Sequence, residues 1–262
     1  MRLPRSARSL AAALIAATAL TGCATPPPAS DPEALADFKR TNDPFEPTNR
    51  VLYEINNAID GVLLRPLAVG YINAVPVPVR THVHNVLANL NSPVVLANDM
   101  LMGKPRRAGD TLTRFVVNST AGVGGIFDVA SGLGFPDHSS DFGEVMAIWG
   151  IPEGPFLFLP ILGPTDPRDA AGYGIDIVLD PFTWIGQGNT VRNLGYVRYG
   201  MTAVDTRAGL IPDLDKVKEQ ALDPYATFRS LYRQHRAAQI NTIKNDTRRT
   251  EPDWYPATPA AH

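Results

Sequence analysis

The stretch from Gly150 to Pro167 most constrains the fold, because eight of its eighteen positions are Gly or Pro. That density excludes a helix interior, since Pro removes an amide donor and Gly costs backbone entropy. The same stretch contains large apolar side chains: Phe156, Leu157, Phe158, Leu159, Ile161 and Leu162. An irregular backbone this apolar must be enclosed by other elements, or lie against lipid with its polar groups satisfied locally. It is therefore either a rigid buried connector in a helical core or the wall of a site for an apolar ligand.

The first 22 residues have the pattern of a secretory signal. Their amino-terminal part carries three positive charges and no acidic residue, with Arg2, Arg5 and Arg8. The apolar run from Leu10 to Leu20 is far too short to span a bilayer. We therefore expect residues 1–22 to be a signal peptide that is removed.

Cys23 directly follows Leu-Thr-Gly and is the only cysteine of the chain. This pattern matches the bacterial lipobox, in which the cysteine receives a diacylglycerol and the new amino terminus is acylated. The alternative is a small buried thiol, which its position, neighbours and uniqueness disfavour. Three acyl chains anchor a protein essentially permanently, since each buried methylene contributes about 0.8 kcal/mol. Ala24 follows, and the absence of Asp at this position is typical of lipoproteins sent to the outer membrane of Gram-negative cells.

Charge and hydropathy exclude two classes of protein. Removal of the signal and its three arginines lowers the formal net charge from −2 to −5, which does not suit a nucleic-acid-binding protein. No apolar run of eighteen or more residues follows the signal, so the sequence predicts no simple membrane-spanning helix. We expect a body that is anchored by lipid and is either soluble or laid into the bilayer surface.

The mature chain divides into three parts. Residues 23–41 are expected to form a lipidated, Pro-rich tether, which stays extended from Thr25 to Pro32. Residues 42–240 predict one helical domain. Residues 241–262 are polar and contain proline, so we expect a disordered tail.

Apolar side chains recur at helical spacing through most of the domain, in segments separated by proline. Asp43 is expected to cap the first helix, with Pro44 in its first turn. Pro66 and Pro93 are expected to end helices. The pattern predicts a mainly α fold of short amphipathic helices joined by irregular Gly- and Pro-rich loops. Such helices can lie in the plane of a bilayer.

The signatures of common enzymes are missing, including the Gly-x-Ser-x-Gly elbow, the His-Glu-x-x-His zinc motif and the Walker loop. The segment His138–Asp141 contains the residue types of a catalytic triad, but we interpret it as a polar loop. Arg168 and Asp169 predict a local ion pair, although Arg168 could also meet a phosphate. We expect no enzyme, no metal site and no cofactor other than the covalent lipid on Cys23.

A glycine-rich run follows the segment that begins at Asp110. Phe127 stands where a dinucleotide-binding fingerprint needs its third glycine, and the run follows an apparent helix instead of a strand. Nucleotide binding is therefore rejected. A closely packed apolar hairpin accounts better for this run, because glycine lets backbones approach each other.

With these segments identified, the chain resembles the MlaA (VacJ) family of outer-membrane lipoproteins from about Asn42 to Arg236. The likeness rests on five motifs: NDPFEPTNR at Asn42–Arg50, LLRPLAVGY at Leu63–Tyr71, TRFVVNSTAGVGGIFDVA at Thr113–Ala130, FGEVMAIWGIPEGPFLFLPILGPTDPRD at Phe142–Asp169 and DPYATFR at Asp223–Arg229. Pro47 and the polar tail beyond Arg236 depart from the family pattern.

The resemblance implies a single ring- or disc-like helical body in the inner leaflet of the outer membrane, facing the periplasm. Such proteins associate with trimeric porins and provide an amphipathic channel for phospholipids. Phospholipids misplaced in the outer leaflet pass through this channel to a periplasmic lipid-binding shuttle, MlaC. This transport maintains the lipid asymmetry of the outer membrane. Retrograde phospholipid transport is thus the expected function. The alternatives are an envelope scaffold that binds porins without transporting lipid, and a phospholipid hydrolase.

Two sets of residues are expected to serve this function. The candidate lipid path joins the glycine-rich run and the apolar stretch: Gly122, Gly124, Gly125, Phe156, Leu157, Phe158, Leu159, Arg168 and Asp169. The candidate shuttle contact is an arginine stripe on the last predicted helix: Arg229, Arg233 and Arg236.

Overall fold

Helices make up most of the computed structural model, which describes residues 25–135, 137–184 and 188–245. They are α2 (Pro32–Thr41), α3 (Glu46–Ile59), α4 (Arg65–Ala74), α5 (Val77–Leu101), α6 (Pro105–Thr120), α7 (Val129–Gly132), α8 (Phe142–Ile148), α9 (Pro167–Leu179), α10 (Asn189–Gln220) and α11 (Pro224–Asn245). A π-helical segment, η1 (Asp60–Leu64), joins α3 to α4, and a 3-10 turn, η2 (Pro181–Thr183), follows α9. The expected mainly α fold is confirmed.

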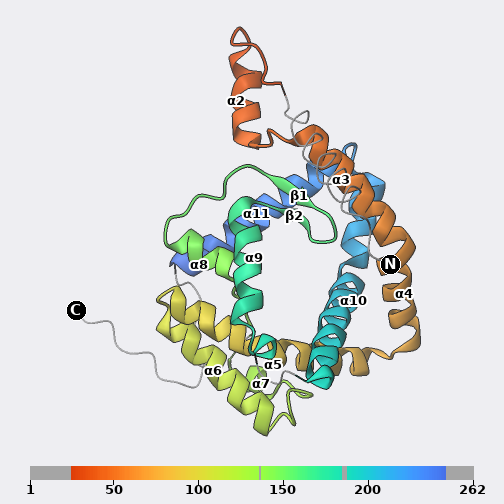
Figure 1. Ribbon diagram of the computed structural model, residues 1–262, viewed down its shortest axis with the longest axis vertical. Coiled ribbons are helices and arrows are strands. Elements are labelled where there is room, and N and C mark those ends of the chain that lie inside the picture. The colour runs from red at the N-terminus through yellow and green to blue at the C-terminus, as the bar shows by residue number, and fades with distance from the viewer. Residues whose placement is uncertain (1–24, 136, 185–187, 246–262) are drawn as a thin grey trace, which may run out of the picture.

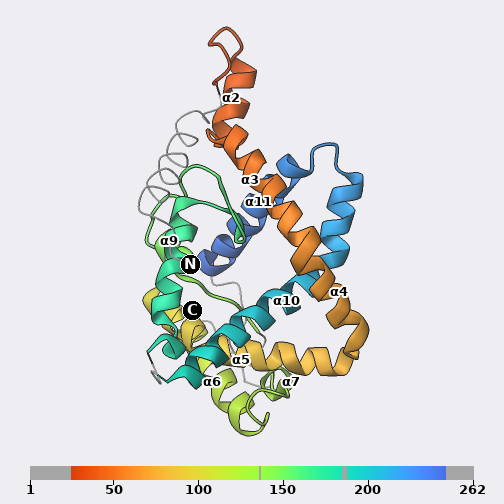
Figure 2. The same cartoon turned by 45° about the vertical axis from the view of Figure 1, so that its right-hand side comes forward.

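The helices are arranged around a ring (Figure 1). Helices α3 and α4 form one side, α5 crosses one end, and α9 lies on the opposite side. Helix α10 runs from the end of α9 across to α4, and α11 then returns to α8 (Figure 2). Helix α2 stands away from the ring. No helix in the described ranges is both long enough and apolar enough to cross a bilayer.

The Gly- and Pro-rich stretch forms a small hairpin of β1 (Leu157–Leu159) and β2 (Gly163–Thr165). The strands pair antiparallel, with Phe158 opposite Pro164. Phe156 and Phe158 are buried and pack with Tyr53 of α3 and Tyr225 of α11. The interpretation of this stretch as a buried connector is therefore correct for Phe156 and Phe158.

Proline ends fewer helices than the sequence predicts. Helix α5 continues through Pro93, and the buried side chains that follow include Val94 and Val95. Packing of this half of α5 outweighs the missing hydrogen bond, because tertiary contacts supply most helix stability in proteins. At Pro66 the helical run also continues, because the wider π-helical turn of η1 precedes the proline ring and accommodates it.

The predicted start of the first helix is wrong. Helix α3 begins at Glu46, and Pro47, not Pro44, lies in its first turn. Asp43 does not cap this helix. Its carboxylate is instead buried and accepts hydrogen bonds from Asn49 and from Tyr225 of α11.

Helical structure extends beyond the predicted bounds of the domain at both ends. The tether contains α2, which Asp31 caps by accepting a hydrogen bond from the amide of Ala34 at 2.9 Å. Helix α11 continues to Asn245, and Ile243 is buried against Met102 and Val145, so the tail does not begin at residue 241. The signal peptide, Cys23 and residues 246–262 lie outside the described residues.

Candidate functional site

A cavity of about 500 Å³ lies between α5, α6, α9, α10 and the loop of residues 137–141. Its walls are both apolar and charged. Helix α5 contributes Leu87 and Val94, and α9 contributes Tyr173 and Ile177. This volume falls within the roughly 300–1,000 Å³ of typical ligand pockets.

Helix α10 presents a polar stripe to this cavity, formed by Arg198, Thr202 and Asp205. Their spacing of four and three residues places them on one helix face. Arg198 forms an ion pair with Asp180, which also accepts a hydrogen bond from the hydroxyl of Tyr199 at 2.7 Å. This ion pair holds α10 against the end of α9.

Asp205 joins α10 to the opposite wall. One of its carboxylate oxygens lies 2.8 Å from Nδ1 of His84 on α5, and the other accepts a hydrogen bond from Tyr71 of α4 at 3.3 Å. The carboxylate side chain is 12% exposed, whereas His84 is 65% exposed. Asp205 therefore carries a largely enclosed negative charge at the cavity.

Asp176 of α9 is a second carboxylate on the cavity wall. It accepts hydrogen bonds from the side chain of Asn98 at 2.7 Å and from the backbone amide of Phe142 at 3.2 Å. Burial raises the pKa of Asp176 to about 6, because these neutral donors compensate only part of its lost hydration.

The polar end of the cavity contains the residue types of a catalytic triad, but they do not form one. Asp99 accepts hydrogen bonds from the hydroxyl groups of Ser140 at 2.6 Å and Thr111 at 2.7 Å, and lies 2.8 Å from Nε2 of His138. Burial alone would raise the pKa of Asp99, but these hydrogen bonds outweigh it and lower the pKa. Ser140 is bonded to the carboxylate and not to the imidazole, so this arrangement does not activate its hydroxyl as a nucleophile.

No member of the candidate lipid path lines this cavity. The glycine-rich run is closely packed, as predicted: a Cβ on Gly122 would lie 2.2 Å from the carbonyl oxygen of Phe127. Gly125 has φ +90°, and its Cβ would meet the side chain of Asn89 at 2.5 Å. These two glycines are needed for packing, and a role for the run in lipid movement stays a prediction.

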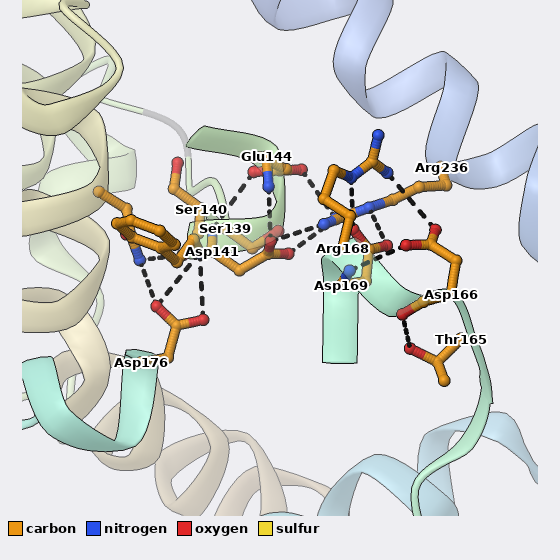
Figure 3. Close-up of polar contacts among 12 residues, drawn as sticks. Ser139, Ser140, Asp141, Glu144, Thr165, Asp166, Arg168, Asp169, Asp176 and Arg236 are labelled. Atoms are coloured by element: carbon orange, nitrogen blue, oxygen red, sulfur yellow. Dashed lines mark hydrogen bonds and ion pairs between the residues drawn. The ribbon is translucent and has the colours of Figure 1, made fainter. Parts of the chain in front are cut away.

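Arg168 is buried and, with Asp169, belongs to an ion-pair network (Figure 3). Arg168 Nε lies 3.0 Å from Asp169, which confirms the predicted local ion pair. Arg236 lies between Asp169 and Asp141, with nitrogen–oxygen distances of 2.6 Å to both. Glu144 of α8 is 3.4 Å from the same guanidinium. Burial, together with the charge of Asp141, raises the pKa of Glu144 to about 7.

The arginines of the candidate shuttle contact do not form an exposed stripe. The side chain of Arg236 is 8% exposed and is held by the network above. Arg229 pairs with Asp43 at 2.7 Å, and Arg233 pairs with Glu153. These arginines are enclosed because carboxylates distant in sequence converge on α11. Contact of these arginines with a shuttle stays a prediction, and an exposed arginine stripe does not support it.

The sequence pattern does not reveal the cavity, because its walls come from helices far apart in the chain. One signal was available, since Arg198, Thr202 and Asp205 recur at helical spacing. The charged face of such a helix is more often exposed to solvent, so the pattern alone does not identify a site.

The chain is similar to known proteins over nearly its whole folded part. The family model described as MlaA lipoprotein matches residues 41–239. The "Intermembrane phospholipid transport system lipoprotein MlaA" of Haemophilus influenzae is 34% identical over 242 residues, which cover 90% of this chain and 92% of the relative. The protein of the same description from Escherichia coli K12 is 32% identical over 228 residues, 85% of each chain.

A solved structure has a similar fold. It is described as "Structural basis for maintenance of bacterial outer membrane lipid asymmetry" and matches with a TM-score of 0.66 at 29% identity. The match covers 76% of this chain and 99% of that chain. The helical ring and the sequence similarity along it lead to one conclusion: this chain belongs to the MlaA lipoprotein family.

Proposed function

We propose that this chain removes misplaced phospholipids from the outer leaflet of the outer membrane and passes them towards the inner membrane. Its relatives are described as lipoproteins of an intermembrane phospholipid transport system. In this proposal the protein is anchored through Cys23, lies in the inner leaflet of the outer membrane, and binds phospholipid in the cavity between α5, α9 and α10. It acts as a passive conduit and not as an enzyme.

The observation that supports the proposal most is that the cavity has both charged and apolar walls. A phospholipid on its way between membranes needs polar partners for its headgroup and apolar surface for its acyl chains, because unpaired buried charge is costly. The polar partners are on the α10 stripe of Arg198, Thr202 and Asp205. The apolar surface is provided by Leu87 and Ile177.

Exposed apolar side chains on the ring support contact with lipid. Apolar side chains are exposed along α3, η1 and α4, and Val62 is 83% exposed. The set includes Val51, Ile55, Val62, Leu63 and Leu67. A soluble monomer rarely exposes so many large apolar side chains within one segment, whereas helices lying in a bilayer surface require them.

Two partners belong to the same proposal. Porin trimers would hold the ring within the outer membrane, and the periplasmic lipid-binding shuttle MlaC would receive the phospholipid. A scaffold that binds porins without moving lipid is the alternative. A scaffold does not need an open cavity, so a variant with a blocked cavity distinguishes lipid transport from porin binding alone.

The experiment measures phospholipid exposed in the outer leaflet of intact cells after deletion of the gene. Complementation uses the wild type, Ala88→Trp and Val79→Trp at equal protein levels. Ala88 lines the cavity, whereas Val79 is exposed on the same helix and does not. We expect the wild type and Val79→Trp to restore low exposure, and Ala88→Trp to fail.

Restoration by Ala88→Trp would contradict passage through this cavity and favour the scaffold. The hydrolase alternative is tested with the purified wild-type chain and phospholipid vesicles, from which we expect no release of fatty acid. Release that depends on His138 would overturn the conduit.

A further inference from the structure

We propose that the cavity selects phospholipids whose headgroup joins a phosphate to a primary ammonium group, over anionic headgroups that lack an amine. This inference rests on the proposed function, because it names the lipid class that the same cavity takes. It follows from the distribution of charge on the cavity walls.

Carboxylates outnumber guanidinium groups at the cavity. The carboxylates are Asp137, Asp141, Asp176, Asp180 and Asp205, and the guanidinium groups are Arg114 and Arg198. Three of these carboxylates form ion pairs with an arginine: Asp137 with Arg114, Asp141 with Arg236, and Asp180 with Arg198.

Among the described residues, Asp176 and Asp205 have no Lys or Arg within ion-pair distance. Asp176 is bonded to neutral amide donors. Asp205 is bonded to a phenol and to an imidazole, and the imidazole of His84 is charged only when protonated. Two enclosed negative charges therefore face the cavity without a permanent cation, which favours a cationic ligand and disfavours an anionic one.

Arg198 gives an independent indication of a phosphate. Its side chain is 9% exposed and lines the cavity. One terminal nitrogen pairs with Asp180 and the other donates to the carbonyl of Leu90 at 3.4 Å. Its Nε–H has no hydrogen-bond partner among the described residues. Buried donors are nearly always satisfied, and a phosphate oxygen is a strong acceptor for guanidinium.

The guanidinium group of Arg198 and the carboxylate of Asp205 come from the same face of α10. Arg198 and Asp205 are two turns apart, about 10 Å along the axis of α10, with Thr202 between them. A headgroup lying along this stripe places its phosphate at the Arg198 end and its ammonium at the Asp205 end. The apolar walls from α5 and α9 then receive the first part of the acyl chains.

A primary ammonium also fits Asp205 better than a quaternary one. Its N–H groups donate charge-assisted hydrogen bonds to the carboxylate, whereas a trimethylated amine has none to donate. The structure therefore assigns the order phosphatidylethanolamine, phosphatidylcholine, phosphatidylglycerol for binding in this cavity.

The test uses the full-length lipidated chain in detergent, mixed with equal amounts of these three phospholipids with identical acyl chains. Bound lipid is extracted after removal of the excess and quantified by mass spectrometry. We expect phosphatidylethanolamine to exceed phosphatidylglycerol about tenfold, as one charge-assisted hydrogen bond would give.

Three variants locate the selection. Asp205→Asn keeps the size of the side chain and should lower the ratio to a few-fold, because the carboxylate of Asp176 remains on the cavity wall. Asp215→Asn, on the same helix but outside the cavity, should keep the wild-type ratio. Arg198→Lys retains a cation for Asp180 but loses the Nε–H donor, and it should lower the binding of all three lipids without changing their order. Circular dichroism of each variant confirms that the helices are retained.

Equal binding of the three lipids by the wild type would overturn the selection and leave transport standing. An unchanged ratio in Asp205→Asn would overturn the assignment to this carboxylate. If the wild type bound no phospholipid at all, the proposed function itself would fail.

Discussion

The carboxylate of Asp43 accepts a hydrogen bond from the hydroxyl of Tyr225, 182 residues later in the chain. Arg229, one turn further along α11, forms an ion pair with the same carboxylate at 2.7 Å. Asp43 and Tyr225 are buried and the side chain of Arg229 is only 14% exposed, so one enclosed carboxylate links the start of the domain to its last helix. This connection closes the ring between α3 and α11.

We expect Asp43→Asn to destabilise the chain by about 3 kcal/mol or more, because it leaves the guanidinium of Arg229 buried with less compensation. The measurement is urea unfolding in detergent, followed by circular dichroism. The control is Asp215→Asn, whose carboxylate forms an exposed pair with Arg65 and should contribute about 0–1 kcal/mol. Equal losses in the two variants would show that the Asp43 contacts do not close the ring.

The approach of α8 to α9 depends on Gly172. A Cβ at this position would lie 2.3 Å from the backbone nitrogen of Gly143, and backbone cannot move aside as a side chain can. Gly172→Ala should therefore destabilise the chain by about 1–3 kcal/mol. Gly174, two residues later on α9, has open space at its Cβ, so Gly174→Ala should be neutral or stabilise by up to about 1 kcal/mol. Thermal unfolding of both variants decides the matter, and a stable Gly172→Ala would contradict the close packing.

Glu144 should make stability depend on pH. Because its pKa rises to about 7 on folding, the folded chain holds a proton between about pH 4.3 and 7 that the unfolded chain releases. Its contribution to stability is therefore complete below about pH 4.3 and is lost as the pH rises to 7. Asp176 acts in the same direction up to about pH 6.

Glu144→Gln should flatten the fall in stability from pH 5 to pH 7.5, measured as the urea midpoint at several pH values. Glutamine has nearly the same shape and can still accept the hydrogen bond from the amide of Asp141. Glu54→Gln, at an exposed position of α3, should keep the wild-type slope. The idea fails if the two variants have the same pH dependence. Asp99 and Asp169, with lowered pKa values, act only below about pH 4 and leave this range unaffected.

Lipid attachment is expected at Cys23. Cells fed radiolabelled palmitate should label the wild-type chain, whereas Cys23→Ser should carry no label and should be retained with its signal peptide. Mass spectrometry of the amino-terminal peptide gives the same answer for the unlabelled protein. Label on the Cys23→Ser variant would place the lipid elsewhere.

The sequence determined those features that depend on local chemistry. The apolar spacing predicted a helical body, which the structure confirms. The close packing of the glycine-rich run was predicted, although as a hairpin, and Arg168 with Asp169 was predicted as an ion pair. These features follow from neighbours in the chain, whose geometry the backbone itself fixes.

Only the tertiary structure decided which charged groups are buried and which residues surround the cavity. Asp43 has the sequence context of an N-cap and is instead a buried partner of α11. The arginines of α11 have the spacing of an exposed stripe and are instead paired with carboxylates from other segments. The cavity residues Asp176, Arg198 and Asp205 likewise come from two helices. Burial of a charge is favourable only where distant groups compensate it, and a linear pattern does not contain those distances.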